Sequence, residues 1–344
     1  MDKAATEKFD ALIGQCFEDK PRVAVFTHKF PDPDAIGASA GIAWLFNYHG
    51  GNAKIFYDGE VSNSQNQTLV NIFNIVMNPI EEYKPEDFDL RIMVDCTTAN
   101  GIIADPDVVI DHHKVSETKS DIIFLHDSLG ACCTLVVELM QGLDSVEWKD
   151  LEPTPAGLLY FGIRNDTDDF LSEATTKRDL GAIASLTPLV ELKKMRSVID
   201  FPLPQYYFEL KKVLTREGNN RIEGSCFCAT IGMVTDIKRD SLGMIADEMI
   251  RYDGIETSII FGLVENRLEA CVRSQNSSQD VNQLCKRIFG KDNAGGKMQK
   301  GAAKLPLDRF FSPSDAPPGP IQDKLWEALK EKTFHTVFQT VSGD

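Results

Sequence analysis

The sequence lacks the features of a membrane or secreted protein. No apolar run approaches the roughly 20 residues that a helix needs to cross a bilayer. The N-terminal residues Met1-Asp2-Lys3-Ala4 do not form a basic segment followed by an apolar one, which a signal peptide requires. These absences predict a cytoplasmic protein without a membrane partner.

Positive charge is also scarce. Lys and Arg together number 36 against 52 Asp and Glu, so the formal net charge is −16. An acidic surface repels phosphate and cannot gain the counterion release that dominates binding to long nucleic acids. Long DNA or RNA is therefore a disfavoured partner, although a local basic pocket can still hold a small anion.

The eight cysteines contain no Cys-x-x-Cys pair and are scattered through the 344 residues. In a chain of this length, scattered cysteines are typical of small buried apolar side chains. The sequence therefore predicts neither a disulfide framework nor a zinc ribbon or redox dithiol.

What is present is the composition of an ordinary globular protein, with 42% hydrophobic and 26% charged residues. The length predicts two domains. In the first half, short apolar runs alternate with helical patterns, as in a parallel α/β sheet. The strands expected there are Val23–Thr27, Lys54–Tyr57, Arg91–Val94, Val108–Ile110 and Ile122–Leu125.

Changes of pattern mark the expected domain boundaries. A charged, helix-forming stretch contains the break Pro202-Leu-Pro204, which predicts a linker. A second α/β unit follows, and then a proline-rich connector, Ser312–Pro320, leads to an amphipathic helix from Ile321 to about Phe338. The apolar residues of this helix, Trp326 among them, either close a dimer or cover its own domain. The expected divisions are 1–189, 190–216, 217–312 and 313–344.

The strongest functional signal follows the first expected strand, in the run His28-Lys29-Phe30-Pro31-Asp32-Pro33-Asp34. Such a turn lies at the carboxyl edge of a parallel sheet, where open α/β folds bind ligands. Aspartates one residue apart can ligate different metal ions, and Gly37 permits close backbone approach. By itself, the run is equally compatible with Asp34 capping the next helix.

Three further apolar segments, all expected to be strands, also end in potential metal ligands. Asp95 and Asp111-His112-His113 each follow one, and Asp166 follows the segment Leu158–Ile163. Carboxylates crowded at one buried edge without basic partners repel one another, and divalent cations remove that cost. The convergence predicts a metal site formed by His28, Asp32, Asp34, Asp95, His112 and Asp166.

These residues resemble the DHH phosphoesterases in order and spacing. The resemblance covers His28–Ser39, Asp95, the family-naming Asp111-His112-His113, and Gly162–Thr167. It implies an α/β fold in which a parallel-sheet DHH domain precedes a smaller α/β domain, with the active site in the cleft between them. The length and the acidic charge favour the small oligoribonuclease/pAp phosphatase branch.

The resemblance divides the ligands between two divalent cations. One ion is expected on His28, Asp32, Asp95 and Asp166, and the other on Asp34, Asp95, His112 and Asp166. Oxygen and imidazole donors with open positions suit manganese, our first expectation, or magnesium. Two such ions can turn a bridging water into a hydroxide nucleophile. By the same resemblance, Asp111 orients His112 and His113 faces the substrate phosphate.

The C-terminal half resembles the DHH-associated domain, which has an Arg-Ser strand followed by a glycine-rich loop. Here the two features are Ala270–Ser274 and Ala294–Ala303. They imply substrate-binding roles for Arg273, Ser274, Gly295, Gly296 and Lys297. Two positions depart from the family pattern, because Lys297 stands where a histidine is usual and Asp168 where a glycine is usual. These departures bear on the identity of the substrate.

The expected function is hydrolysis of short phosphoesters, namely oligoribonucleotides, dinucleotides or pAp. The expected partner is a small phosphorylated substrate or a short oligonucleotide, with a homodimer as a possible assembly. One alternative is an exopolyphosphatase or pyrophosphatase. A second alternative is a non-catalytic module that senses a nucleotide.

Overall fold

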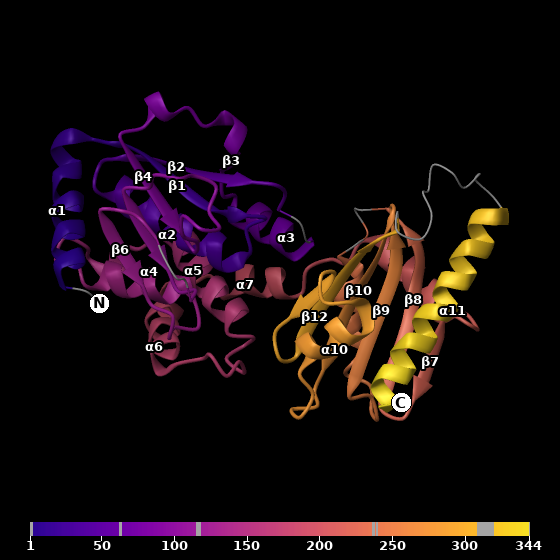
Figure 1. The fold of residues 1–344 in the computed structure, drawn as a ribbon. Coiled ribbons are helices and arrows are strands. Elements are labelled where there is room, and N and C mark those ends of the chain that lie inside the picture. Colours follow the sequence, from indigo (N-terminus) through magenta and orange to yellow (C-terminus); the bar gives the residue numbers. More distant parts are fainter. Residues whose placement is uncertain are drawn as a thin grey trace. The chain divides into compact units, whose positions relative to one another are not determined.

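The computed structural model describes residues 3–61, 64–114, 118–235, 238, 240–307 and 320–343. The chain divides into two compact units, Met1–Pro202 and Leu203–Asp344, each described by itself here (Figure 1). This division falls inside the expected linker, 190–216. Of the expected proline-rich connector, residues 312–319 lie outside the described part of the chain.

The first unit is built on a sheet of six parallel strands, as predicted. Their order in the sheet is β3 (Met77–Pro79), β2 (Asn52–Asp58), β1 (Arg22–Lys29), β4 (Leu90–Val94), β5 (Val108–Asp111) and β6 (Ile122–Leu125). The order reverses between β1 and β4, and a ligand crevice forms outside the carboxyl ends of strands at such a point. The fold therefore places its binding edge where the expected ligands lie.

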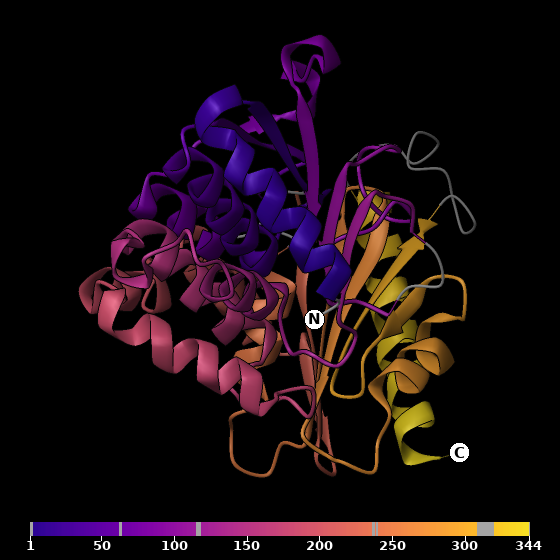
Figure 2. The ribbon, with the colours of Figure 1, turned by 90° about the vertical axis from the view of Figure 1, so that its left-hand side faces the viewer.

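Helices cover one face of this sheet (Figure 2). The helices of the unit are α1 (Lys3–Asp19), α2 (Pro33–Tyr48), α3 (Ser64–Phe73), α4 (Cys132–Gln141), α5 (Pro153–Asp166), α6 (Lys177–Leu186) and α7 (Leu192–Ile199). On the other face, Ala24 of β1 and Phe56 of β2 pack against Tyr83, Phe88 and Ile102 from connecting segments. Burial on both faces explains why these strands read as continuous apolar runs.

The expected strand at Leu158–Ile163 is wrong, because this segment lies in helix α5. An apolar run of this length fits a buried helix as well as a strand, and most of α5 is buried. At Gly162 an added Cβ would lie 2.5 Å from Cys133 Sγ and 2.9 Å from the Pro33 carbonyl oxygen, so glycine allows α5 to approach the start of α2. Asp166 consequently reaches the sheet edge from the end of a helix.

The second unit has a mixed sheet of six strands. In order they are β11 (Ala294–Gly296), β12 (Lys300–Pro306), β10 (Arg267–Ser274), β9 (Thr257–Val264), β8 (Cys226–Val234) and β7 (Asn220–Glu223). Only β8 and β9 run parallel among these pairs. Helices α8 (Gln205–Leu214) and α9 (Ser241–Met249) pack on one face, and α10 (Val281–Phe289) and α11 (Pro320–Ser342) on the other. The predicted second α/β domain is confirmed.

Helix α11 covers the sheet of its own unit. Trp326 and Phe334 are buried and lie against Phe261 of β9, with ring centroids 6.3 and 5.2 Å away. The apolar face that the sequence left without an assigned partner therefore belongs to this core.

The eight cysteines are all free thiols, and only Cys271 is partly exposed, as expected of small apolar side chains. Among the described residues, no helix combines the length and apolarity required to span a membrane.

Candidate metal centre

The six predicted metal ligands all lie in the first unit and meet at the carboxyl edge of its sheet. His28 lies at the end of β1, Asp95 directly follows β4, and His112 directly follows β5. Asp32 and Asp34 belong to the start of α2, and Asp166 to the end of α5. Four segments that are distant in sequence thus supply one cluster.

Asp95 stands between the two imidazoles. Its Oδ2 lies 3.5 Å from His28 Nε2, and its Oδ1 lies 3.5 Å from His112 Nε2. His28 Nε2 also lies 3.8 Å from Asp32 Oδ1. Two groups of donor atoms, each within 4.8 Å of one another, result on the two sides: His28, Asp32 and Asp95 on one, and Asp34, His112 and Asp166 on the other.

Backbone carbonyl groups orient both imidazoles. His28 Nδ1 lies 2.9 Å from the Lys29 oxygen, and His112 Nδ1 lies 3.1 Å from the Leu129 oxygen. An N–H at Nδ1 can donate to these oxygens, so Nε2 is the ring nitrogen that faces the carboxylates and can ligate a metal ion once it is deprotonated. The expectation that Asp111 orients the His112 ring is therefore wrong, because Leu129 does so.

Asp111 instead organises the turn after β5 and the ring of His113. Its Oδ1 accepts hydrogen bonds from the backbone N–H groups of His112 and His113, at 2.8 and 3.1 Å. The same oxygen lies 2.9 Å from His113 Nδ1, and this bond raises the pKa of His113. The His113 side chain is half exposed, and its Nδ1 lies 3.6 Å from Asp95 Oδ1. The His113 ring therefore lies partly exposed beside the cluster.

Asp32 and Asp34 are held in place by helix N-termini. Asp32 caps α2 by accepting the backbone N–H groups of Asp34 and Ala35, both at 3.0 Å. Asp34 accepts those of Cys132 and Cys133 at the start of α4, at 2.6 and 2.9 Å. A carboxylate has about four acceptor positions, so these bonds fix the side chains and leave positions for a metal ion.

The electrostatics of the cluster fit a bound cation. Asp95 is buried, and within the described part of the chain its Oδ1 accepts no hydrogen bond. Burial, reinforced by the charge of Asp34, raises the pKa of Asp95 well above its usual range, and burial raises that of Asp34 to about 6. A nearby divalent cation favours the charged form of such carboxylates. Oxygen and imidazole donors suit manganese or magnesium.

Without a metal ion, the neighbouring carboxylates favour the protonated form of His28. Burial lowers the pKa of this imidazole, but hydrogen bonds to Asp32 and Asp95 outweigh burial and raise the pKa to about 11. At Asp32, burial acts to raise the pKa, but the hydrogen bond from His28 helps to outweigh burial, so the pKa is lowered. A metal ion on His28 would displace this proton.

The backbone adopts left-handed conformations in the cluster and beside it. Asp95 has φ 56°, and the residues after Asp166 include Asp168, Asp169 and Phe170 at φ 50°, 58° and 70°. Non-glycine residues rarely adopt this left-handed region, and such strain concentrates at functional sites. The positive φ at position 168 accounts for the glycine that is usual there, and Asp adopts this region more readily than most other side chains.

Apart from His113, the residues expected to bind substrate lie in the second unit. Arg273 pairs with Asp247 of α9, with Nε 2.5 Å from Oδ1 and Nη2 3.3 Å from Oδ2. Ser274 is buried, and its Oγ lies 3.1 Å from Thr257 Oγ1. Successive strand residues point to opposite faces of a sheet, so the side chains of Arg273 and Ser274 lie on opposite faces.

The glycine-rich segment forms the hairpin between β11 and β12. An added Cβ at Gly296 would collide with the Lys300 carbonyl oxygen and with Gly301, so close strand pairing requires glycine there. The Lys297 backbone N–H donates to the same carbonyl at 2.8 Å, and the Lys297 side chain is exposed. Gly295 pairs with Ala302 across the hairpin.

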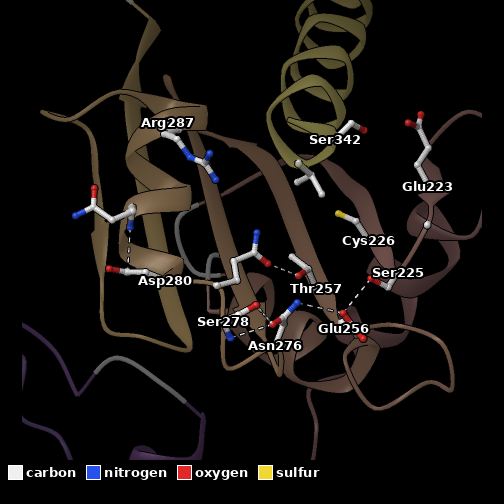
Figure 3. Close-up of a pocket in the computed structure, with 14 residues that line it drawn as sticks. Glu223, Ser225, Cys226, Glu256, Thr257, Asn276, Ser278, Asp280, Arg287 and Ser342 are labelled. Carbon is white, nitrogen blue, oxygen red and sulfur yellow. Dashed lines mark hydrogen bonds between the residues drawn. The ribbon is translucent and has the colours of Figure 1, made fainter. Parts of the chain in front are cut away.

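A polar pocket of about 590 Å³ lies within the second unit, lined by Glu256, Thr257 and Asn276 among others (Figure 3). Thr257 donates to Gln279 at 2.9 Å, and the Asn276 amide donates to Glu256 at 3.3 Å. Arg287 is the one basic side chain among the described lining residues. Sequence reasoning missed this pocket, although the polar run Asn276-Ser-Ser-Gln-Asp280 lines part of it.

Comparison with known proteins finds a family match within the first unit. Residues 22–163 match the model described as the DHH family, N-terminal domain. This span includes every residue of the cluster except Asp166. A crystal structure of an exopolyphosphatase-related protein from Bacteroides fragilis aligns over 98% of both chains, with 13% identity and a TM-score of 0.66. This likeness shows that the fold is shared across both units.

Three curated relatives differ in what their names state. An uncharacterized protein from Methanocaldococcus jannaschii is 25% identical over 325 residues, 93% of this chain and 65% of that protein. The bifunctional oligoribonuclease and PAP phosphatase NrnA from Mycoplasma genitalium is 29% identical over 176 residues, 48% of this chain and 52% of NrnA. A probable manganese-dependent inorganic pyrophosphatase from Staphylococcus epidermidis is 28% identical over 176 residues, 49% of this chain and 55% of that protein. The chain therefore spans less than two thirds of the length of each relative.

Proposed function

Because residues 22–163 match the model of the DHH family, N-terminal domain, we propose that this chain is a two-metal hydrolase of short phosphoesters. The observation that carries the proposal is the buried Asp95 carboxylate, whose two oxygens each face the Nε2 atom of a different imidazole. An isolated buried carboxylate is costly, and a cation on either side of it removes that cost.

In this proposal, His28, Asp32 and Asp95 would hold one cation and Asp34, His112 and Asp166 the other, and Asp95 and Asp166 would contribute to both. The pair supplies Lewis-acid activation of water and neutralises charge on the phosphate. Manganese is the preferred ion, in keeping with the donor set and with the name of the staphylococcal relative. Magnesium is the alternative.

The protein's own groups prepare this site. The Lys29 and Leu129 carbonyls hold the imidazoles of His28 and His112 in the ligating tautomer. Asp111 raises the pKa of His113, so that this ring can donate a hydrogen bond to a phosphate oxygen as negative charge develops. Asp34 fixes the start of α4 while it contributes a carboxylate to the cluster.

For the substrate, we propose a short oligoribonucleotide, a dinucleotide or pAp. The acidic surface argues against long nucleic acids as substrates. The name of the relative NrnA states oligoribonuclease and PAP phosphatase activities. Pyrophosphate or polyphosphate is the second candidate. It is favoured by the pyrophosphatase relative and by the exposed Lys297, Lys300 and Lys304 on one hairpin.

A substrate panel with manganese tests this choice. We expect the purified chain to cleave a diribonucleotide or to release phosphate from pAp, and to lose this activity in EDTA. Release of phosphate from polyphosphate or pyrophosphate, without cleavage of either nucleotide, would favour the second candidate. If none of these compounds were hydrolysed with manganese or magnesium, the enzymatic proposal would be wrong.

Manganese is expected to raise the melting temperature more at about pH 7.5 than at about pH 5.5, because the ligands must be deprotonated. The pKa of Asp34 is raised to about 6 and that of Asp95 is raised further, so both take up protons toward the lower pH. A raised carboxyl pKa stabilises the metal-free fold at low pH, and this contribution is lost as the pH rises through the folded pKa.

The stability of the metal-free protein should thus decline as the pH rises, while manganese binding becomes stronger. The raised pKa of His28 acts in the same direction at higher pH. The check is thermal unfolding with EDTA or with manganese at both pH values. Equal shifts of melting temperature at the two pH values would contradict the assignment of buried carboxylates as ligands.

A further inference from the structure

Phe30 presents an aromatic ring beside the metal cluster without belonging to it. Its side chain is 50% exposed, which is unusual for a phenylalanine next to a buried site. It is two residues from His28 and two from Asp32, and this spacing keeps its Cα within about 7 Å of theirs. A ligand held by the cluster therefore has this ring within reach.

The position of Phe30 is fixed by the end of the neighbouring strand β2. The residue has φ 59°, a left-handed conformation that is rare for a bulky side chain. Its backbone N–H donates to the Asp58 carbonyl at 2.9 Å. The ring lies over Gly59, where an added Cβ would be 2.5 Å from a ring carbon. The molecule thus maintains a strained residue to hold an exposed ring in one place.

The ring packs on Gly59 after β2, on the side of β1 away from β4. The cluster occupies the switch point between β1 and β4, whereas Gly59 follows β2 on the other side of β1. In doubly wound folds that bind dinucleotides, the phosphates lie after the first strand and the ribose is held near the end of the second. By analogy with that arrangement, a phosphate at the cluster would extend its ribose and base toward Phe30.

We propose that Phe30 is a stacking platform for the nucleobase of the substrate, an inference that rests on the proposed phosphoesterase function. Stacking on an aromatic face tolerates any base, because every base has a π-face. A polyphosphate chain has no such face and gains nothing from the ring. The proposal therefore assigns the substrate to the nucleotides and sets it apart from inorganic polyphosphate or pyrophosphate.

The test compares pAp with a matched compound that lacks adenine, the methyl riboside 3,5-bisphosphate, using the full chain with manganese. We expect KM to be lower for pAp in the wild type. Phe30→Ala should reduce the ratio of the two KM values about tenfold, given the usual strength of base stacking. Phe30→Trp should preserve the ratio, whereas Phe30→Leu, which still covers Gly59, should behave like Phe30→Ala.

The matched control is Phe208→Ala, which removes a phenylalanine that is 62% exposed in the second unit. It should leave the KM ratio at the wild-type value. The inference would be overturned if Phe30→Ala left the KM ratio unchanged. Such a result with both KM values raised would indicate a structural role, and with both values unchanged it would indicate no role.

A binding measurement separates this inference from the proposed function. Calorimetric titration of AMP and of ribose 5-phosphate, with manganese present, does not require turnover. Tighter binding of AMP that Phe30→Ala removes would support base recognition even if the wild type hydrolysed neither bisphosphate, in which case only the hydrolytic proposal would fail. Equal binding of AMP and ribose 5-phosphate by the wild type would exclude the stacking platform.

Discussion

Asp95→Asn is expected to reduce phosphoester hydrolysis by at least about 10³-fold, or ~4 kcal/mol of transition-state stabilisation. The amide keeps the size of the side chain and tolerates the φ of 56° at this position. It removes the charge that faces both His28 and His112. Initial rates with manganese, measured for the wild type and the variant on the same substrate, give the result.

The same substitution should make the metal-free protein more stable, because it removes a buried charge whose pKa is strongly raised. The matched control is Asp179→Asn, at a second fully buried aspartate of the first unit. Asp179 accepts from Thr134 Oγ1 at 2.6 Å and from the Thr176 backbone N–H at 2.7 Å. Its replacement should destabilise the fold by about 1–3 kcal/mol. Loss of stability in both variants would contradict the role assigned to Asp95.

Gly37→Ala is expected to destabilise the first unit by about 1–3 kcal/mol, the usual cost of overpacking a core. An added Cβ would lie 2.5 Å from the Leu158 carbonyl oxygen and 2.7 Å from Cys133 Sγ. Because Gly37 is one turn after Asp34, the displaced helix should also carry that carboxylate away from the cluster. Manganese binding should weaken together with stability.

The control for this substitution is Gly14→Ala, on the exposed side of α1, where an added Cβ meets no atom within 4 Å. It should stabilise the protein by up to about 1 kcal/mol through helix propensity. Chemical denaturation and manganese titration of both variants provide the comparison. A Gly37→Ala protein as stable as the wild type would show that α2 and α5 do not approach as closely as described.

Strands buried on both faces were the part of the fold that the sequence predicted best. Their apolar runs identified β1, β2, β4, β5 and β6 of the first sheet. The edge strand β3 has only three residues, one of them Pro79, and gives no pattern. Strand β12 consists largely of small residues and lysines, so its alternation is weak. The sequence of α5 shows no helical periodicity of apolar residues, because the helix is buried on several sides.

The metal cluster was predictable because its side chains follow apolar strands or an apolar segment. The groups that orient it were not, because they depend on contacts between distant segments. Leu129 acts through a carbonyl, and Asp34 reaches the start of α4 almost a hundred residues away. The left-handed conformation of Phe30 is contrary to its residue type. Sequence patterns predict which side chains form the cluster, whereas tertiary packing determines how those side chains are oriented.

The number of manganese ions bound per chain tests the central claim most directly. Metal-free protein titrated with manganese and followed by electron paramagnetic resonance should bind two ions per chain, and Asp95→Asn should lose at least one of them. Binding of no manganese or magnesium by the wild type, or an unchanged number in Asp95→Asn, would contradict the two-metal site.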